Sequence, residues 1–352
     1  MHGRYASGAY ITENPRGGSE MNILAGTSKG VFSLKGKASQ HLLESQEVRD
    51  LVRIGDVFFA GTGSGVFLST DNGKSWLCTG LEDREVWQIR GGEIGSRIYA
   101  VTQPAELYCS DNEGQTWQQI ETFSQLPQAA EWCLPLTPPQ PGRARALVID
   151  QNNPLEIWVG VEVGGIAHTK DGGETWDFSL PGENPDLHMM CAQPDESDVL
   201  YASTGYGRLD GVAEMVEGNA GVFRSDDSGK TWDYAWKGIT PRYSRPMCID
   251  ARSPHGLTVA CAPTAFSSFK DEGGAKAMLL RSEDRGMSWR SLCDTAHSPC
   301  AANIHALTPD AERVGGVVIG TDTGEVWRVS NDGRWELLGE QLPSVLSAIT
   351  YQ

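Results

Sequence analysis

The sequence lacks the features that mark several large classes of protein. No apolar run approaches the roughly 18 residues of a membrane-spanning helix, so we expect no membrane partner. Lys and Arg form no cluster and the net charge is −17, whereas a nucleic-acid surface needs concentrated positive charge, so we expect no nucleic acid either. Residues 1–20 lack the apolar core of a signal peptide, which predicts a flexible leader or tag remnant before one domain of residues 21–352.

Cysteine pairs and metal-ligand spacings are missing as well. Eight cysteines are present, but none forms a Cys-x-x-Cys pair. Several lie in strand-like patterns, where a reduced cysteine is a small apolar side chain. With no export signal, this favours reduced thiols and a cytoplasmic location. No group of His, Cys, Asp or Glu has the fixed spacing of a metal site, so no metal ligand is assigned and the cofactor stays unknown. A divalent metal remains an alternative, because two His and Glu162 could hold one directly.

The sequence is rich in glycine, with 41 residues, and repeats one motif, Ser/Thr-x-Asp-x-Gly-x-Ser/Thr-Trp. Its Asp can accept hydrogen bonds from turn amides, its Gly can take a positive φ, and its Trp can fill the space between neighbouring sheets. We therefore interpret the motif as a β-hairpin turn and not as catalytic machinery. Four full copies, a fifth with Asn112 in place of Asp and a shortened sixth end at Trp76, Trp176, Trp232, Trp289, Trp117 and Trp335.

This motif is the Asp-box, and residues 22–352 resemble the Asp-box (BNR-repeat) β-propellers, which have a WD40/YVTN-like and sialidase-superfamily-like architecture. Seven strand pairs recur, from NILAGTSKGVFSL to GVVIGTDTGEVWRVS, and residues 345–351 supply an inner strand for the first pair. The sequence thus predicts an all-β, seven-bladed β-propeller closed by its C-terminal strand, an arrangement that removes free sheet edges. The other six inner strands are expected at 47–54, 86–91, 144–150, 187–193, 245–250 and 303–308.

A candidate site lies on the face opposite the Asp-box turns. Three segments longer than a minimal turn, 122–143, 205–220 and 263–277, map to that face, where loops on a rigid scaffold commonly carry function. Alignment of the inner strands puts one polar residue of each in a single column, which is expected to line the mouth of the central channel. A packing column would consist of Val, Ile or Ala. The column contains Arg145, His188, Arg245 and His305, approximately Arg49 and Trp87, and Leu346 or Ser347.

Polar residues in a propeller channel can be merely solvated, but two His, two Arg and Glu162 on one face favour a ligand site. We expect a small anionic substrate, held by Arg145 and Arg245, because a guanidinium matches carboxylate or phosphate oxygens. Lyase- or hydrolase-type chemistry is expected from three catalytic residues, His188, His305 and Glu162. The remaining substrate-binding residues are Arg49, Trp87, Tyr206 and Tyr243. Trp132 is expected to pack a loop, and His168 to be structural.

Two other functions remain open. The chain is similar to the seven-bladed Asp-box propellers that help assemble photosystem II, which implies a non-catalytic scaffold with a protein partner. The likeness to sialidases implies a glycosidase, but their Phe/Tyr-Arg-Ile-Pro motif is missing near the N-terminus, and Tyr243-Ser244-Arg245-Pro246 is only an imperfect equivalent. A glycosidase would pair Glu162 with Asp186 or Glu214.

Overall fold

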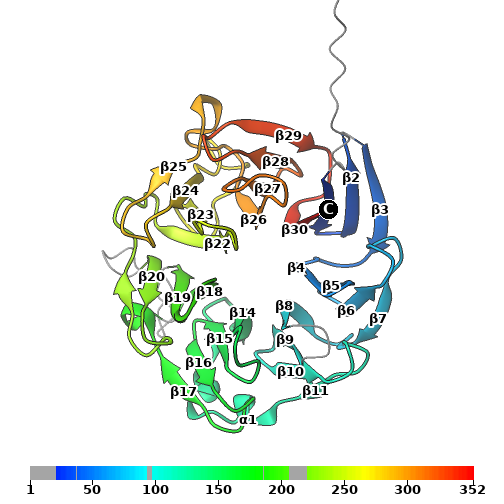
Figure 1. Ribbon diagram of the computed structural model, residues 1–352, viewed down its shortest axis with the longest axis vertical. Coiled ribbons are helices and arrows are strands. Elements are labelled where there is room, and N and C mark those ends of the chain that lie inside the picture. The colour runs from blue at the N-terminus through cyan, green and yellow to red at the C-terminus, as the bar shows by residue number, and fades with distance from the viewer. Residues whose placement is uncertain (1–20, 37, 93–96, 185, 206–219) are drawn as a thin grey trace, which may run out of the picture.

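The computed structural model describes residues 21–36, 38–92, 97–184, 186–205 and 220–352. Seven four-stranded antiparallel sheets are arranged in a ring as blades (Figure 1), which confirms the expected all-β propeller. All seven inner strands lie where the sequence predicts them, within two or three residues at each end. None of the helices in the described part of the chain is long and apolar enough to cross a membrane.

Each blade is a meander of four strands. From the channel outward, the first two blades are β30 (Val345–Tyr351), β1 (Asn22–Thr27), β2 (Gly30–Lys35) and β3 (Ala38–Glu44), then β4 (Asp50–Ile54), β5 (Val57–Thr62), β6 (Gly65–Ser69) and β7 (Leu77–Gly80). The next three are β8 (Glu85–Gly91), β9 (Ile98–Gln103), β10 (Leu107–Ser110) and β11 (Gln118–Gln119); β14 (Arg143–Ile149), β15 (Ile157–Glu162), β16 (Gly165–Thr169) and β17 (Asp177–Ser179); and β18 (Leu187–Gln193), β19 (Glu196–Thr204), β20 (Gly221–Ser225) and β21 (Asp233–Tyr234). The last two are β22 (Tyr243–Ile249), β23 (Leu257–Ala262), β24 (Met278–Ser282) and β25 (Arg290–Ser291), then β26 (Ile304–Pro309), β27 (Val317–Thr321), β28 (Val326–Val329) and β29 (Trp335–Gly339).

Short elements decorate the connections between blades. They are α1 (Glu121–Ser124), the 3-10 turns η1 (Pro127–Glu131), η2 (Pro181–Glu183) and η3 (Thr295–His297), and a small hairpin of β12 (Cys133–Leu134) and β13 (Gln140–Pro141).

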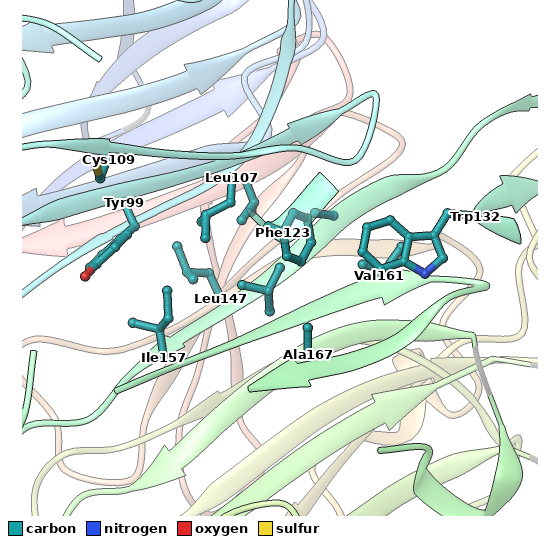
Figure 2. Packing of buried hydrophobic residues seen from close by; sticks show 12 residues of the cluster. Tyr99, Leu107, Cys109, Phe123, Trp132, Leu147, Ile157, Val161 and Ala167 are labelled. Carbon is teal, nitrogen blue, oxygen red and sulfur yellow. The ribbon is translucent and has the colours of Figure 1, made fainter. Parts of the chain in front are cut away.

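The hydrophobic core is divided among the interfaces between blades. The second strand of each blade is covered on both faces by its neighbours, so β5 and β9 are almost continuously buried and read as apolar runs. At one interface, Tyr99 and Leu107 meet Leu147 and Ile157 of the next blade (Figure 2). Outer strands such as β3 are mostly exposed.

The Asp-box turns have the expected chemistry. In the first copy, the Ser69 hydroxyl donates to Asp71 Oδ1 at 2.7 Å, and the same oxygen accepts from Ser75 N at 2.9 Å. Gly73 has a φ of +79°. The Trp76 indole N–H donates to the Gly73 carbonyl at 2.9 Å. The motif is therefore a self-contained folded turn, which also holds the carboxyl pKa of Asp71 well below its usual range through bonds from Ser75 and Ser69.

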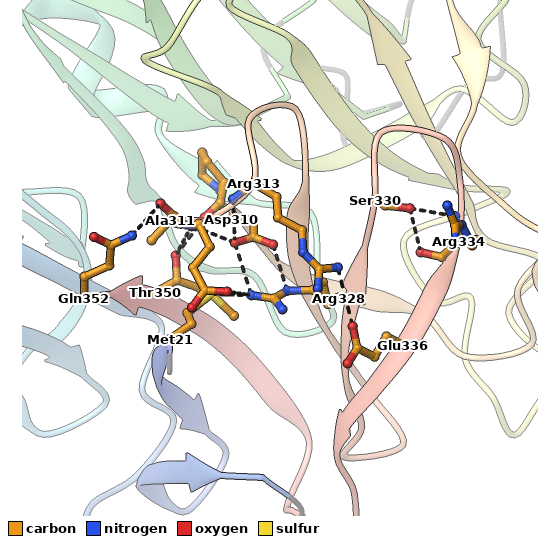
Figure 3. A network of polar contacts seen from close by, with 12 residues as sticks. Met21, Asp310, Ala311, Arg313, Arg328, Ser330, Arg334, Glu336, Thr350 and Gln352 are labelled. Carbon is orange, nitrogen blue, oxygen red and sulfur yellow. Dashed lines mark hydrogen bonds and ion pairs between the residues drawn. The ribbon is translucent and has the colours of Figure 1, made fainter. Parts of the chain in front are cut away.

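The ring closes through β30, as predicted. This strand pairs antiparallel with β1, for example Ala25 with Ala348. Thr350 Oγ1 donates to the Pro309 carbonyl at 2.8 Å and so joins β30 to the preceding blade, within which Arg328 Nε lies 2.8 Å from Asp310 Oδ2 (Figure 3). Main-chain bonds thus hold the first and last strands together, and a side-chain bond ties the last strand to the blade before it.

Candidate functional site

A β-bulge recurs at the same step of the inner strands, and it determines which side chains face the channel mouth. The register shifts between residues 86 and 88, 144 and 146, 187 and 189, 244 and 247, 304 and 306, and at the β30–β1 pairing. A bulge re-aims the extra residue out of the regular ladder. The bulged positions are Trp87, Arg145, His188, Arg245 with Pro246, His305 and Leu346, six of the seven members of the predicted column. The seventh member, Arg49, directly precedes β4, whose pairing with β5 has no bulge.

These side chains line a cavity of about 250 Å³ at the mouth. A deeper channel of about 480 Å³ continues below it and shares part of its wall. The described residues of the cavity wall carry four guanidinium groups but one carboxylate, that of Glu162, although the whole chain has a net charge of −17; Arg49 is also paired with Glu47 and Glu85 beside the cavity. The positive lining therefore belongs to this cavity and not to the general surface. The lining comprises Arg49, Trp87, Gln88, Arg143, Arg145, Glu162, His188, Met189, Arg245, Pro246, His305 and Leu346.

Trp87 is the platform for three of the arginines. The guanidinium carbons of Arg49, Arg143 and Arg145 lie 3.9, 4.7 and 5.0 Å from the centre of its ring. Cation–π attraction favours this clustering, while mutual repulsion opposes it. Burial lowers the pKa of both Arg49 and Arg143, and the charge of Arg145 lowers each of them further. A negative ligand would relieve that repulsion.

Glu162, at the end of β15, is neutralised by two of these arginines. Arg145 Nη1 lies 2.8 Å from Glu162 Oε2, and Arg143 Nε lies 3.4 Å from the same oxygen. Burial alone would raise the carboxyl pKa, but the charges of Arg145 and Arg143 outweigh it and hold the pKa below its usual range. Glu162 is therefore ionised. Its closest charged partners are arginines and not a histidine.

His188 is fixed on several sides. Its Nδ1 lies 2.5 Å from the Ser244 carbonyl, while Nε2 lies 3.2 Å from Asp186 Oδ1 and 3.2 Å from the Tyr243 hydroxyl. The ring is 2% exposed, so it cannot rotate freely. The carboxylate in contact with His188 is thus Asp186, which the sequence analysis names only as a glycosidase alternative.

Arg245 is the least neutralised arginine of the wall. Its Nη2 donates to the Ala265 carbonyl at 2.7 Å, and its guanidinium lies 5.1 Å from the centre of the Tyr243 ring. Among the described residues it has no carboxylate within ion-pair distance, and its Nε is buried without a hydrogen-bond partner. Burial opposes its charge, but Tyr243, Glu162 and Asp186 raise the pKa of Arg245, so the guanidinium stays charged.

His305 faces the same cavity from β26, the inner strand of the blade next to that of Arg245. Burial, together with the charges of Arg245 and Arg145, lowers the pKa of His305 to about 4. Its imidazole is therefore neutral near pH 7. A neutral ring can accept a proton or a hydrogen bond beside a cationic wall.

The structure brings together all but one of the residues proposed from the sequence. Tyr206 lies outside the described residues. Arg143, Gln88 and Asp186 are the additional participants. Arg143 could have been found from the sequence, because it lies two residues before Arg145 on the same strand and so on the same face. The contact of Asp186 with His188 could not, because it depends on how the segment before β18 is placed.

Two further expectations concerned residues away from the ligand. Trp132 packs against Phe123, with ring centroids 4.9 Å apart, in the core between two blades. His168 bonds Glu156 at 3.0 Å and stacks on Trp158. The prediction of structural roles for both is confirmed.

Fold and cavity together define a class: a closed seven-bladed Asp-box β-propeller with an arginine-rich channel mouth. The chain belongs to the family of the DUF6242 beta propeller domain, whose model matches residues 16–240.

Curated relatives are xyloglucan-cleaving enzymes. A probable oligoxyloglucan-reducing end-specific xyloglucanase of Neosartorya fischeri is 22% identical over 284 residues, covering 69% of this chain and 32% of that protein. The corresponding enzyme of Emericella nidulans is 24% identical over 234 residues, covering 55% of this chain and 25% of that protein. The chain thus spans a third or less of the curated relatives it matches.

Solved structures share the fold. The Niastella koreensis GH74 enzyme superposes with a TM-score of 0.61 at 13% identity, over 89% of this chain and 46% of that one. YCF48 bound to D1 peptide superposes with a TM-score of 0.55 at 14% identity, over 93% of this chain and 85% of that one. At these identities the likeness shows the architecture only.

Proposed function

We propose that the channel mouth binds a small anionic molecule, a carboxylate or a phosphate, and acts on it by lyase- or hydrolase-type chemistry. The observation that carries the proposal is the charge of the cavity: four guanidinium groups face one carboxylate. Arg245 in particular has no carboxylate partner among the described residues. A buried, unpaired charge is costly, and an anionic ligand would supply the missing partner.

The chemical step is assigned to the residues that face the anion. Arg245 and Arg145 hold its oxygens from two sides of the ring, and Arg49 and Arg143 add positive charge. His305, neutral near pH 7, accepts the proton that such a reaction must move. The hydrolase branch is also supported by the distant sequence relation to xyloglucanases.

Calorimetric titration tests the binding step. Inorganic phosphate, citrate and glucuronate are titrated into wild-type protein, an Arg245→Gln variant and an Arg53→Gln control. Arg53 belongs to the inner strand β4, at the end away from the mouth, and pairs with Asp56. We expect binding to wild type and control, and a loss of about tenfold or more in Arg245→Gln, because a charged hydrogen bond contributes about 1.5–3 kcal/mol. Equal binding by all three proteins, or none by any, would contradict the proposal.

Protein binding on the same face is a second candidate. The similarity to YCF48 bound to D1 peptide extends over most of both chains. Next to Ala265, which Arg245 bonds, Phe266 is 82% exposed and Phe269 is 43% exposed. If a protein partner is captured by cross-linking, a Phe266→Ser variant should lose it while still binding small anions. Retention of the partner by that variant would argue against this surface.

A further inference from the structure

Two side chains in the wall of the mouth, Glu162 and His188, converge with Asp186 just behind the wall, from two neighbouring blades. Glu162 ends β15, Asp186 directly precedes β18, and His188 is the bulged residue of β18. Glu162 and Asp186 are also joined as an isolated antiparallel bridge, so the backbone holds the two carboxyl groups together. One potential ligand atom from each of the three residues lies within 4.8 Å of the other two.

The orientation of His188 is that of a metal ligand. The Ser244 carbonyl can only accept, so Nδ1 must carry a hydrogen in their 2.5 Å contact. That bond leaves the Nε2 lone pair facing two groups, the Tyr243 hydroxyl and Asp186 Oδ1, each 3.2 Å away. A lone pair and a carboxylate oxygen repel each other unless positive charge lies between them. A histidine that donates its other N–H to a backbone carbonyl is the usual arrangement for metal ligation.

Glu162 retains a free oxygen despite its arginine partners. Arg143 and Arg145 both approach Oε2. Among the described residues, no ion pair or hydrogen bond is formed with Oε1. A carboxylate can therefore serve two arginines through one oxygen and a cation through the other.

We propose that Glu162, Asp186 and His188 bind one divalent transition-metal ion, Zn²⁺ or Mn²⁺. One imidazole nitrogen and two carboxylate oxygens suit these ions better than Ca²⁺, which takes six to eight oxygen ligands. Three protein ligands leave a coordination position open toward the cavity, as in catalytic zinc sites. Glu162 comes from one blade, and Asp186 and His188 come from the next, so the three have no sequence spacing typical of a metal motif. The inference goes beyond anion binding and does not depend on it.

The arginines set the expected affinity. Arg143 and Arg145 withdraw charge from Glu162, and their positive field opposes a second cation. We therefore expect weaker binding than in structural zinc sites, with a dissociation constant on the order of micromolar. A bound anion on the arginine wall would offset that field.

The test measures the metal directly. Wild type, Asp186→Asn, His188→Gln and a His255→Gln control are stripped with chelator, titrated calorimetrically with ZnCl₂ and MnCl₂, and analysed for metal after dialysis. His255 forms a comparable pair with Asp195 at 2.6 Å but has no third potential ligand among the described residues. We expect one equivalent in wild type and control, and at least about tenfold weaker binding in each site variant. Near-ultraviolet circular dichroism establishes that the variants are folded.

Two results would overturn the proposal. One is the absence of Zn²⁺ and Mn²⁺ binding by folded wild type at 100-fold excess over protein, on the order of millimolar metal. The other is an NMR spectrum in which both ring nitrogens of His188 carry hydrogens near pH 7 in the presence of metal, which would assign the charge between His188 and Asp186 to a second proton. Arg245→Gln should bind metal as wild type does, so failure of the metal site and failure of the anion site are separable.

Discussion

The two faces of the propeller use polar residues in opposite ways. On the Asp-box face, the turn carboxylates accept hydrogen bonds from within their own turns. Asp227, for example, accepts from Ser225 Oγ, Thr231 N and Thr231 Oγ1 at 2.7–2.8 Å. At the mouth, charged groups come from different blades, and three arginines, Arg49, Arg143 and Arg245, have a buried Nε without a hydrogen-bond partner among the described residues. Locally satisfied polar groups stabilise a fold, whereas convergent and incompletely satisfied ones are what a ligand needs.

This contrast predicts that substitutions near the Asp-box face change stability and spare binding, while those at the mouth do the reverse. The largest stability effect is expected for Trp158→Ala. The side chain is 1% exposed, and its indole N–H donates to the Ser228 carbonyl of the next blade at 2.8 Å. Its removal should destabilise the protein by about 3–5 kcal/mol. Denaturant unfolding measures this loss of stability. The folded variant should bind the anion with the same affinity as wild type. A drop in affinity would show that the two faces are coupled.

The second prediction concerns His305 and acid. Its pKa is about 4 in the folded protein, below the ordinary value near 6.5, so the unfolded chain takes up a proton in this range and the folded protein does not. Stability should therefore fall as the pH drops from about 6.5 to 4, by at most about 3 kcal/mol from this group. In His305→Gln the fall should be smaller by that amount. Identical pH profiles of unfolding free energy for the two proteins would contradict it.

The third prediction is that Asp227→Ala destabilises by about 1 kcal/mol, because the lost bonds lie in a turn exposed to water. The folded-state pKa of Asp227 is lowered by its bonds to Thr231 and Ser225 despite partial burial, so this contribution is present at neutral pH and is lost in acid. Unfolding at pH 7 and pH 3 measures both parts. If Asp227→Ala loses as much unfolding free energy at pH 3 as at pH 7, the ionised Asp227 carboxylate is not what stabilises the turn.

The smallest stability change is expected for Arg143→Gln. Glu162 keeps Arg145 as a partner, and removal of one guanidinium relieves repulsion with its neighbours. The unfolding free energy should stay within about 0.5 kcal/mol of wild type, while the affinity for a small anion falls severalfold. Thermal unfolding and calorimetry provide the two numbers. A large destabilisation would mean that Arg143 serves the fold and not the ligand.

Sequence alone predicted the fold because each Asp-box is a local device: Ser69, Asp71 and Gly73 complete their turn without help from distant residues. It also predicted most of the cavity wall, since the inner strands repeat and place a bulge at one step. It could not predict contacts across blade boundaries. Asp186 lies against His188 through the course of a connecting segment, and the sharing of Glu162 by two arginines depends on rotamers in a crowded cavity.

The closing strand has a consequence for how the protein is made. β1 ends at Thr27 and its partner β30 begins at Val345, so during translation β1 waits as an unpaired edge while the other blades emerge from the ribosome. Ile23 and Ala25, buried against the last blade in the finished ring, would be accessible throughout that time. Premature termination or cleavage before β30 would thus leave β1 as an unpaired strand edge, able to pair with other chains, on an otherwise folded propeller. Such truncated products should be substrates for chaperones and proteases.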